Sequence, residues 1–483
     1  MRRIQSDQNR MLNSQLSFLM SSIFKKQEIA KRIERLLPKV HGPTPVWPIG
    51  NLKDFIMKPP YKVLQNYHHQ YGDNVSFWLF NKPAILVTQP EDIKLIVENS
   101  LDIYKNSPKH AAGKYFLSSV FFANGSEWHD KRKAHPFSHS DINTLFSNAV
   151  VTIKQLTSSH AILLNPTESK REILLFDEMT QLSFNIFSHL LLDQEGTKDL
   201  FDCYLTQMED MHRRGATPLS LPSLLLKKRI KGWKRYVEKA LNKYERSDKE
   251  QSSKPTNLPQ WLSELKITNR DNFTLLRDEI STSFYAGTRN VAATISFAIQ
   301  LLSAHKDVYQ KLQRSIDEFV TEHPQGYSDS DLDKLEYLDM VIKETLRLYP
   351  IVPAFFREVL PGRTIKLPFG SLPEKTQIFI SSWVTHRDAN LWENPNDFMP
   401  ERFNTKPTEH SYLPFGSGDR ICVGMGLTQL ITKVVIVELL QKLNLHSILP
   451  SNSSQIDNEY FAGIIIPSDG LAIDISKHLV SEV

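Results

Sequence analysis

Apolar side chains recur every three to four residues along much of the chain. The spacing is clearest from Asp271 to Leu302, from Val308 to Phe319 and from Leu335 to Leu348. A period of about 3.6 residues places these side chains on one face of a helix, where they can pack against a core. We therefore predict a helix in each stretch and a mainly helical chain from about Glu91 onward.

Short strand-like runs interrupt this helical pattern. They are Val75–Leu79, Ala84–Val87, Thr364–Leu367, Gln377–Ser381 and Gly463–Ile475. Runs of this length are typical of strands in small sheets rather than of a large continuous sheet. The expected fold class is therefore mainly α with a smaller β region.

A proline-rich segment separates the start of the chain from the rest. Pro43, Pro45, Pro48 and Gly50 follow each other closely, and a helix cannot continue through them. We expect residues 1–42 to form a basic N-terminal lead and residues 43–483 a single large domain. No repeat or low-complexity tract divides that domain, and 40% hydrophobic with 23% charged residues is usual for a globular protein.

The excess positive charge is concentrated in the lead. The chain has 58 Lys and Arg against 54 Asp and Glu, a net charge of +4, and the first 39 residues hold nine of these cations and three anions. The apolar runs Leu16–Met20 and Ile23-Phe24 are shorter than the ~20 residues that span a bilayer. We expect a cytoplasmic protein without a transmembrane anchor. The basic stretch Ile23–Leu37 either lies on an anionic membrane surface or forms a solvated helix.

Cys422 lies in a glycine-rich loop, within the run Pro414 to Gly424. Arg420 precedes it by two residues, and an apolar helix from Met425 to Leu440 follows. A thiolate in such a loop suits a soft metal centre. The alternative is a buried thiol in an ordinary loop. The other cysteine is Cys203, so a ligand role for Cys422 leaves no disulfide and favours a reducing compartment.

The spacing of five residues in this loop resembles the cytochrome P450 family. The family's haem loop reads Phe-x-x-Gly-x-Arg-x-Cys-x-Gly, and the matching positions are Phe415, Gly418, Arg420, Cys422 and Gly424. The resemblance implies a cytochrome P450 fold from roughly Pro43 to the C-terminus, with haem b (iron protoporphyrin IX) as cofactor. It also implies that Cys422 is the axial ligand of the haem iron, that Phe415 packs near the sulfur and that Arg420 meets a propionate.

Three further residues resemble a structural lock of the family. Glu344 and Arg347 are three residues apart on a predicted helix, so they share one face and can form an ion pair. Surface pairs with this spacing are common, and alone the spacing says little. The family joins the pair to an arginine in a Pro-x-Arg-Phe segment, which here is Arg402. The resemblance implies that Glu344, Arg347 and Arg402 support the haem loop.

Three residues are candidates for holding the haem propionates. Trp128 and Arg132 are one helical turn apart, where an indole N–H and a guanidinium can hold one propionate. A core tryptophan beside a solvated arginine would give the same spacing. Arg357 ends the run Pro353 to Arg357 and matches a strand position that, by the resemblance, reaches the second propionate.

The segment Ala286-Gly287-Thr288-Arg289-Asn290 departs from the family pattern. Family members usually have a small pair followed, after one position, by an acid and an alcohol that relay protons for cleavage of the oxygen–oxygen bond. Ala286 and Gly287 keep the small pair, which makes room for oxygen and substrate. Arg289 replaces the acid and Asn290 the alcohol, and neither is a ready proton relay at neutral pH. These four residues are the catalytic candidates.

Several activities are compatible with this departure. In the first, water or a substrate hydroxyl delivers the protons, Arg289 points away from the haem, and one atom of O2 is inserted into a C–H bond. In the second, the protein resembles peroxygenases that bind a fatty-acid carboxylate through an arginine and use hydrogen peroxide. In the third, it resembles isomerases and dehydratases that carry asparagine here and rearrange lipid hydroperoxides. A fourth alternative is a haem-binding sensor or scaffold that catalyses no reaction.

The monooxygenase is the leading expectation. No flavin or iron–sulfur module fits in the chain, so a separate reductase or ferredoxin would supply electrons by docking near the Cys422 loop. No nucleic-acid partner is expected, and the basic run Lys227–Lys234 is either a solvated helix face or a membrane contact. By resemblance, mostly apolar stretches line the substrate site and suit a hydrophobic molecule. They are Tyr104–Phe122, Leu205–Leu226, Val352–Phe356 and Phe461–Ile465.

Overall fold

The computed structural model describes thirteen stretches of the chain and divides it into two compact units. The described residues are 40–46, 48–80, 82–98, 103–105, 119–135, 149–164, 171–216, 231–239, 241, 270–446, 459–461, 464–467 and 471–477. The first unit comprises residues 1–106, 354–391 and 408–420, and the second comprises residues 107–353, 392–407 and 421–483. The basic stretch Ile23–Leu37 lies outside the described residues.

The first unit is built on a five-stranded sheet with the order β1-β2-β8-β5-β3. Its strands are β1 (Asn74–Leu79), β2 (Lys82–Val87), β8 (Gln377–Ile380), β5 (Phe355–Val359) and β3 (Ile103–Lys105). Strands β2 and β8 are parallel, and the other neighbouring pairs are antiparallel. A separate antiparallel pair joins β6 (Ile365–Leu367) to β7 (Gly370–Leu372).

Short helices complete this unit: α2 (Leu52–Met57), α3 (Pro60–Tyr71), α4 (Pro90–Glu98), α18 (Ser382–Thr385) and the 3-10 turn η3 (Gly418–Arg420). One core cluster joins β2 and β8 to helix α4 through Ile85, Ile378 and Ile93, each with no exposed surface. Leu413, which precedes the cysteine loop, belongs to the same cluster. The start of that loop is therefore fixed to the core of the first unit.

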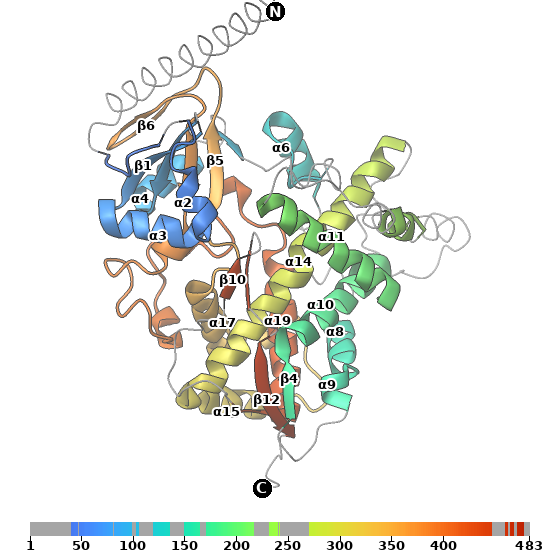
Figure 1. Ribbon diagram of the computed structural model, residues 1–483. Coiled ribbons are helices and arrows are strands. Elements are labelled where there is room, and N and C mark those ends of the chain that lie inside the picture. The colour runs from blue at the N-terminus through green and yellow to red at the C-terminus, as the bar shows by residue number, and fades with distance from the viewer. Residues whose placement is uncertain are drawn as a thin grey trace, which may run out of the picture. The chain divides into compact units, whose positions relative to one another are not determined.

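The second unit is mainly helical. Its helices are α6 (Gly125–Ala134), α8 (Ala149–Ser158), α9 (Ala161–Leu164), α10 (Leu175–Leu192), α11 (Lys198–Ala216), α14 (Arg270–Ala304), α15 (Lys306–Glu322), α16 (Asp329–Leu332), α17 (Glu336–Leu348) and α19 (Met425–Lys442), with the 3-10 turn η2 (Pro400–Asn404). Helix α14, yellow in Figure 1, packs against α10, α17, α19 and α15. Every residue from Val291 to Ala304 is buried, as expected for a helix surrounded by others.

Two small sheets flank these helices. The antiparallel sheet β4-β12-β9 joins β4 (Arg171–Leu174), β12 (Ala472–Lys477) and β9 (Leu443–His446). The pair β10 (Glu459–Phe461) and β11 (Ile465–Pro467) is attached by a hydrogen bond of 2.7 Å from Ile465 N to Ile351 O. Among the described residues, we find no helix that is long and apolar enough to cross a membrane.

The mainly helical fold class with a smaller β region is confirmed, including the helices α14, α15, α17 and α19. The stretch Gly463–Ile475, where we predicted strands, contains β11 and part of β12. Helix α3 lies in a region for which we predicted no helix. Its signal was Pro60, since proline at the first helical position has its φ angle already set for a helix.

Candidate functional site

The first part of the cysteine loop depends on two glycines with positive φ. Gly416 has φ +77° and Gly418 φ +68°, values that residues with a side chain rarely adopt. A methyl group on Gly418 would also lie 2.9 Å from Cβ of Val97 on α4. Glycine is therefore required at 418 both by the backbone angle and by the close approach of α4.

Two histidines hold the same stretch of chain within the first unit. Nε2 of His386, which has no exposed surface, accepts a hydrogen bond of 2.7 Å from the backbone N–H of Leu413. Nδ1 of His410 lies 2.8 Å from the Ser417 hydroxyl. The sequence alone assigned no role to either histidine, because a hydrogen bond between segments distant in the chain leaves no local pattern.

Cys422 lies three residues before α19 in the second unit. It is exposed and takes part in no disulfide. Gly424 is the N-cap of α19, and a methyl group there would lie 4.0 Å from the cysteine sulfur. The positive end of the helix dipole favours the thiolate over the thiol. Cys422 therefore has the exposure and the electrostatic setting of a metal ligand.

Helix α6 reaches the residue next to Cys422. Nη1 of Arg132 donates a hydrogen bond of 3.0 Å to the carbonyl of Ile421. Trp128 lies one turn earlier on the same helix, and both side chains are half-buried. Arg132 therefore contacts the backbone that carries the thiolate, while a propionate contact for Trp128 and Arg132 stays a prediction.

Arg357 on β5 is a buried cation. Its side chain is 4% exposed, and burial lowers its pKa to about 10. Its hydrogen bond goes to the carbonyl of Phe356, and its guanidinium lies 5.0 Å from the Phe355 ring centroid. Among the described residues no carboxylate pairs with it. A buried charge is costly without a counter-ion, so this position suits an anionic group such as a propionate.

The remaining residues of the predicted haem loop are accessible to a bound group. Phe415 and Arg420 are both half-buried. The residue types therefore fit a thiolate-ligated haem: a cysteine sulfur for the iron, arginines for the propionates and glycines where a backbone must approach closely. The individual contacts of Phe415 and Arg420 with such a group stay predictions.

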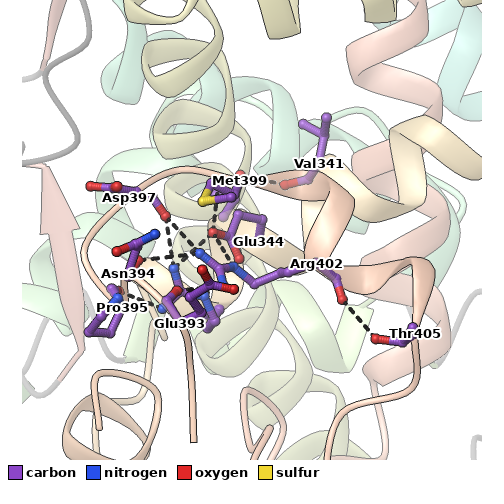
Figure 2. Close-up of polar contacts among 11 residues, drawn as sticks. Val341, Glu344, Glu393, Asn394, Pro395, Asp397, Met399, Arg402 and Thr405 are labelled. Carbon is purple, nitrogen blue, oxygen red and sulfur yellow. Dashed lines mark hydrogen bonds and ion pairs between the residues drawn. The ribbon is translucent and has the colours of Figure 1, made fainter. Parts of the chain in front are cut away.

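Glu344, Arg347 and Arg402 form a buried network in the second unit (Figure 2). Arg347 donates from Nε and Nη2 to the two oxygens of Glu344, at 2.7 and 2.8 Å. Nε of Arg402 donates to Oε1 of Glu344 at 3.0 Å. Both ion pairs of Glu344 are therefore present, and the pair with Arg347 is fully buried, while the side chain of Arg402 is 9% exposed.

The network binds the segment that precedes η2. Arg347 donates to the carbonyls of Pro395 and Asp397, at 2.7 and 3.0 Å. The amide N–H of Met399 donates to Oε1 of Glu344 at 2.9 Å, as Figure 2 shows. The direct action of the lock is thus to fix residues 392–402 on α17, while its support of the haem loop stays a prediction.

Gly287 on α14 faces α10. A methyl group on Gly287 would lie 2.2 Å from Cζ of Phe187, so this glycine lets the two helices approach closely. The neighbouring Thr288 has no exposed surface. Phe187 therefore fills the space beside Gly287. The expectation that Gly287 makes room for oxygen does not hold at this contact.

Arg289 and Asn290 leave α14 in different directions. The Arg289 guanidinium lies 5.3 Å from the ring centroid of Phe176 on α10. Its charge also opposes the increase that burial causes in the pKa of Tyr204 on α11. Asn290 is turned by about 100° from Arg289, because each residue of a helix adds that angle.

Asn290 shares its helix face with Ala286 and Phe297, which are four residues before it and seven after it. Phe297 stacks on Tyr349, directly after α17, with ring centroids 4.5 Å apart. Ala286 and Asn290 are both half-buried. The structure therefore separates the four catalytic candidates into two pairs. Ala286 and Asn290 share one face of α14, whereas Gly287 contacts α10 and Arg289 lies near α10 and α11.

Glu279, nearer the start of α14, was missed in the sequence. Its Oε1 accepts a hydrogen bond of 2.5 Å from the amide of Val120, and Oε2 lies 3.8 Å from Nε2 of His135. Burial raises the pKa of Glu279 to about 7 and lowers that of His135 to about 4. The one signal in the sequence was an acid within an otherwise buried helix.

The predicted walls of a substrate site are described only in part. Residues 106–118, 217–226 and 462–463 lie outside the described residues, as do residues 227–230 of the basic run Lys227–Lys234. Of the remainder, Phe122 is buried and Val352 is 38% exposed. The assignment of these stretches to a substrate site stays a prediction.

Comparison with known proteins gives one consistent result. The family model described as Cytochrome P450 matches residues 40–473. Cytochrome P450 3A14 of Cavia porcellus is 24% identical over 466 residues, which cover 86% of this chain and 87% of that protein.

Other relatives match over shorter stretches at higher identity. Cytochrome P450 71B22 of Arabidopsis thaliana is 40% identical over 172 residues, 34% of this chain and 33% of that protein. Cytochrome P450 3A12 of Canis lupus familiaris is 35% identical over 196 residues, 40% of this chain and 38% of that protein. The matches to these two proteins thus span between a third and two fifths of their lengths.

Proposed function

Since the chain belongs to the cytochrome P450 family of haem enzymes, we propose that it is a haem-thiolate monooxygenase acting on a hydrophobic small molecule. The overall reaction converts a C–H bond, O2, two electrons and two protons into a C–OH bond and water. One oxygen atom enters the substrate, and the other leaves as water. The substrate class is inferred from the apolar composition of the stretches predicted to surround it.

The observation that carries this proposal is the intact cysteine loop. Cys422 is accessible, takes part in no disulfide and lies at the N-terminal end of α19. Gly418 has the positive φ and close packing that exclude other residues, and Gly424 caps the helix. A change at one of the family positions of this loop would instead have favoured a protein that does not activate oxygen. Here every residue of the family pattern is present.

The protein's contribution would be to hold the cofactor and tune its ligand. When bound, a thiolate-ligated haem supplies the oxygen-activating chemistry, because the thiolate donates electron density to the iron. Cys422 would provide that thiolate. Arg132 and Trp128 would hold one propionate, and Arg357 would hold the other, which would neutralise its buried charge.

The contacts of helix α14 also favour the monooxygenase. Under this activity Arg289 is a packing residue, and its contacts with Phe176 and Tyr204 agree with that role. Asn290 can hold a water molecule, since its amide both donates and accepts hydrogen bonds. The protons themselves would then come through water or from a substrate hydroxyl.

A peroxide-using activity is the second candidate. It is favoured by the replacement of the usual acid and alcohol by Arg289 and Asn290. Such an enzyme would act as a fatty-acid peroxygenase or as a lipid hydroperoxide isomerase or dehydratase, and would need no electrons from a partner. The monooxygenase, by contrast, needs a reductase or ferredoxin, which would dock near the loop that carries Cys422.

One experiment separates the two activities. The haem-loaded protein is incubated without reductant with long-chain fatty acids plus hydrogen peroxide, and separately with fatty-acid hydroperoxides, and products are measured by mass spectrometry. A monooxygenase gives product only when a reductase, NADPH and O2 are supplied. Efficient conversion without reductant would instead establish the peroxide-using activity.

A further inference from the structure

No residue of α6 whose side chain the structure describes is buried, and its N-cap residue Asn124 makes no side-chain capping hydrogen bond. Apolar burial is the usual anchor of a short helix, because isolated helices of this length are unstable in water. Yet α6 carries Trp128 and Arg132, which must be placed accurately if they are to hold a propionate.

One buried carboxylate contacts the chain on both sides of this helix. Glu279 Oε1 accepts the hydrogen bond from Val120, which precedes α6, and Oε2 faces His135, which directly follows it. Glu279 and His135 are each 7% exposed, and Val120 is 6% exposed.

We propose that Glu279 is a positioning residue: its carboxylate fixes the chain before α6 through Val120, lies against His135 after α6, and thereby places Trp128 and Arg132 for cofactor binding. The position of Arg132 also affects the thiolate, because Arg132 donates a hydrogen bond to the carbonyl of Ile421, next to Cys422. Glu279 itself touches neither substrate nor cofactor in this scheme. The inference rests on the proposed haem site only for the role of Trp128 and Arg132.

The charges around Glu279 make the contact sensitive to pH. Burial disfavours the carboxylate and raises the pKa of Glu279 to about 7, and Asp278 on the same helix acts in the same direction. The Val120 N–H and Lys131 on α6 favour the ionised form. His135 stays neutral because burial and the nearby charge of Arg132 lower its pKa to about 4. The hydrogen bond from Val120 is therefore charge-assisted at pH 8 and weaker at pH 6.

The test compares Glu279→Gln with Asp278→Asn in the full-length haem-loaded protein. Asp278 is the adjacent buried acid and pairs with Arg277 on the same helix, so its substitution removes a buried charge and leaves the Glu279 carboxylate in place. The rate of amide hydrogen exchange in residues 119–135, corrected for the intrinsic effect of pH, measures how firmly α6 is held. The rate of haem transfer to an acceptor apoprotein measures how firmly the cofactor is bound.

We expect Glu279→Gln at pH 8 to exchange these amides and release haem at least fivefold faster than the wild type. It should resemble the wild type at pH 6. Asp278→Asn should match the wild type at pH 8, where Glu279 is ionised with or without the charge of Asp278. Wild-type exchange and haem release in Glu279→Gln at pH 8 would overturn the proposal. If the variant does not fold, the wild type alone decides, since amide exchange at Val120 that is independent of pH between 6 and 8 would also overturn it. A protein that binds no haem would refute the proposed function, while amide exchange would still report on the anchor.

Discussion

The carboxylate of Glu344 and the guanidinium of Arg347 are joined by two hydrogen bonds, and neither side chain is exposed to solvent. Such a pair is costly to break, because removing one partner leaves the other charge buried and uncompensated. The same carboxylate also accepts hydrogen bonds from Arg402 and from the amide of Met399. Its loss therefore removes four hydrogen bonds to three partner groups.

We expect Glu344→Gln to lower the free energy of unfolding by about 3–5 kcal/mol, the cost of breaking a buried ion pair. Glu401→Gln is the control. Glu401 also pairs with a cation, Lys311 at 2.6 Å, but is 45% exposed on its side chain. The control should cost about 1 kcal/mol or less. Urea denaturation measures both, and equal losses would contradict the assignment of Glu344 as a lock.

Replacing Cys422 with alanine should abolish the thiolate-type haem spectrum while leaving the far-ultraviolet circular dichroism unchanged. The sulfur is exposed and makes no disulfide, so its removal leaves no cavity in the core. Cys203→Ser is the matched control, since it removes the other thiol of the chain. A thiolate spectrum that persists in Cys422→Ala would show that the ligand has been assigned to the wrong residue.

Gly418→Ala should destabilise the protein more than Gly362→Ala. Both glycines have positive φ, +68° and +74°, so each substitution carries a backbone cost of about 1–2 kcal/mol. A methyl group at 418 additionally meets Val97 at 2.9 Å, whereas at 362 nothing lies within 4 Å. Overpacking adds about 1–3 kcal/mol. The difference in urea midpoint between the variants measures the effect of the contact with α4. Equal midpoints would show that α4 shifts to accommodate the methyl group without loss of stability.

Gly287→Ala should destabilise the contact of α14 with α10 by about 1–3 kcal/mol, as for other overpacked cores. The added methyl group would lie 2.2 Å from Phe187. A double variant with Phe187→Leu should recover part of the loss, since the smaller side chain makes room. Thermal unfolding of the single and double variants gives the interaction energy, and strictly additive effects would argue against a direct contact.

The buried pair Glu279 and His135 should shape the pH dependence of stability. The pKa of Glu279 is raised from 4.5 to about 7, so its contribution to stability is complete below pH 4.5 and is lost as the pH rises through 7. The pKa of His135 is lowered from 6.5 to about 4, so its contribution is complete above pH 6.5 and is lost as the pH falls through 4. Stability from this pair is therefore greatest between pH 4.5 and 6.5.

Glu279→Gln should remove the loss on the alkaline side, which we expect to be roughly 3 kcal/mol from the size of the pKa shift. Denaturant midpoints at pH 5, 6.5 and 8 check this for the variant and the wild type. A wild type that is as stable at pH 8 as at pH 5, relative to the variant, would mean that Glu279 is not buried as the structure shows. The gain in stability would coexist with weaker anchoring of α6, because the carboxylate strengthens one contact while its desolvation costs free energy.

The extent to which the sequence predicted this structure follows from how local each signal is. The helices α14, α15 and α17 have long periodic patterns, and the partners Glu344 and Arg347 lie three residues apart on one helix. By contrast, Glu279 and Val120 are 159 positions apart, and Leu413 and His386 are 27 apart. Their hydrogen bonds depend on the folded arrangement of distant segments, so no window of sequence contains both partners.

The same distinction explains the catalytic candidates. A helical period places Ala286 and Asn290 on one face, and the structure agrees. The period cannot say which neighbour meets each face, so the contact of Gly287 with Phe187 and that of Arg289 with Phe176 became visible only in the fold. Gly287 therefore reads as a helix-packing residue, which its small size alone did not reveal.

Residues 392–399 contain neither helix nor strand, and α17 supplies hydrogen bonds to their backbone through side chains about fifty positions earlier. These contacts close a long loop of chain, and closing such a loop costs entropy before any contact forms. The segment therefore cannot become ordered by itself. It should join the native structure late in folding, after α17 has formed, so that mutations in the lock accelerate unfolding more than they slow folding.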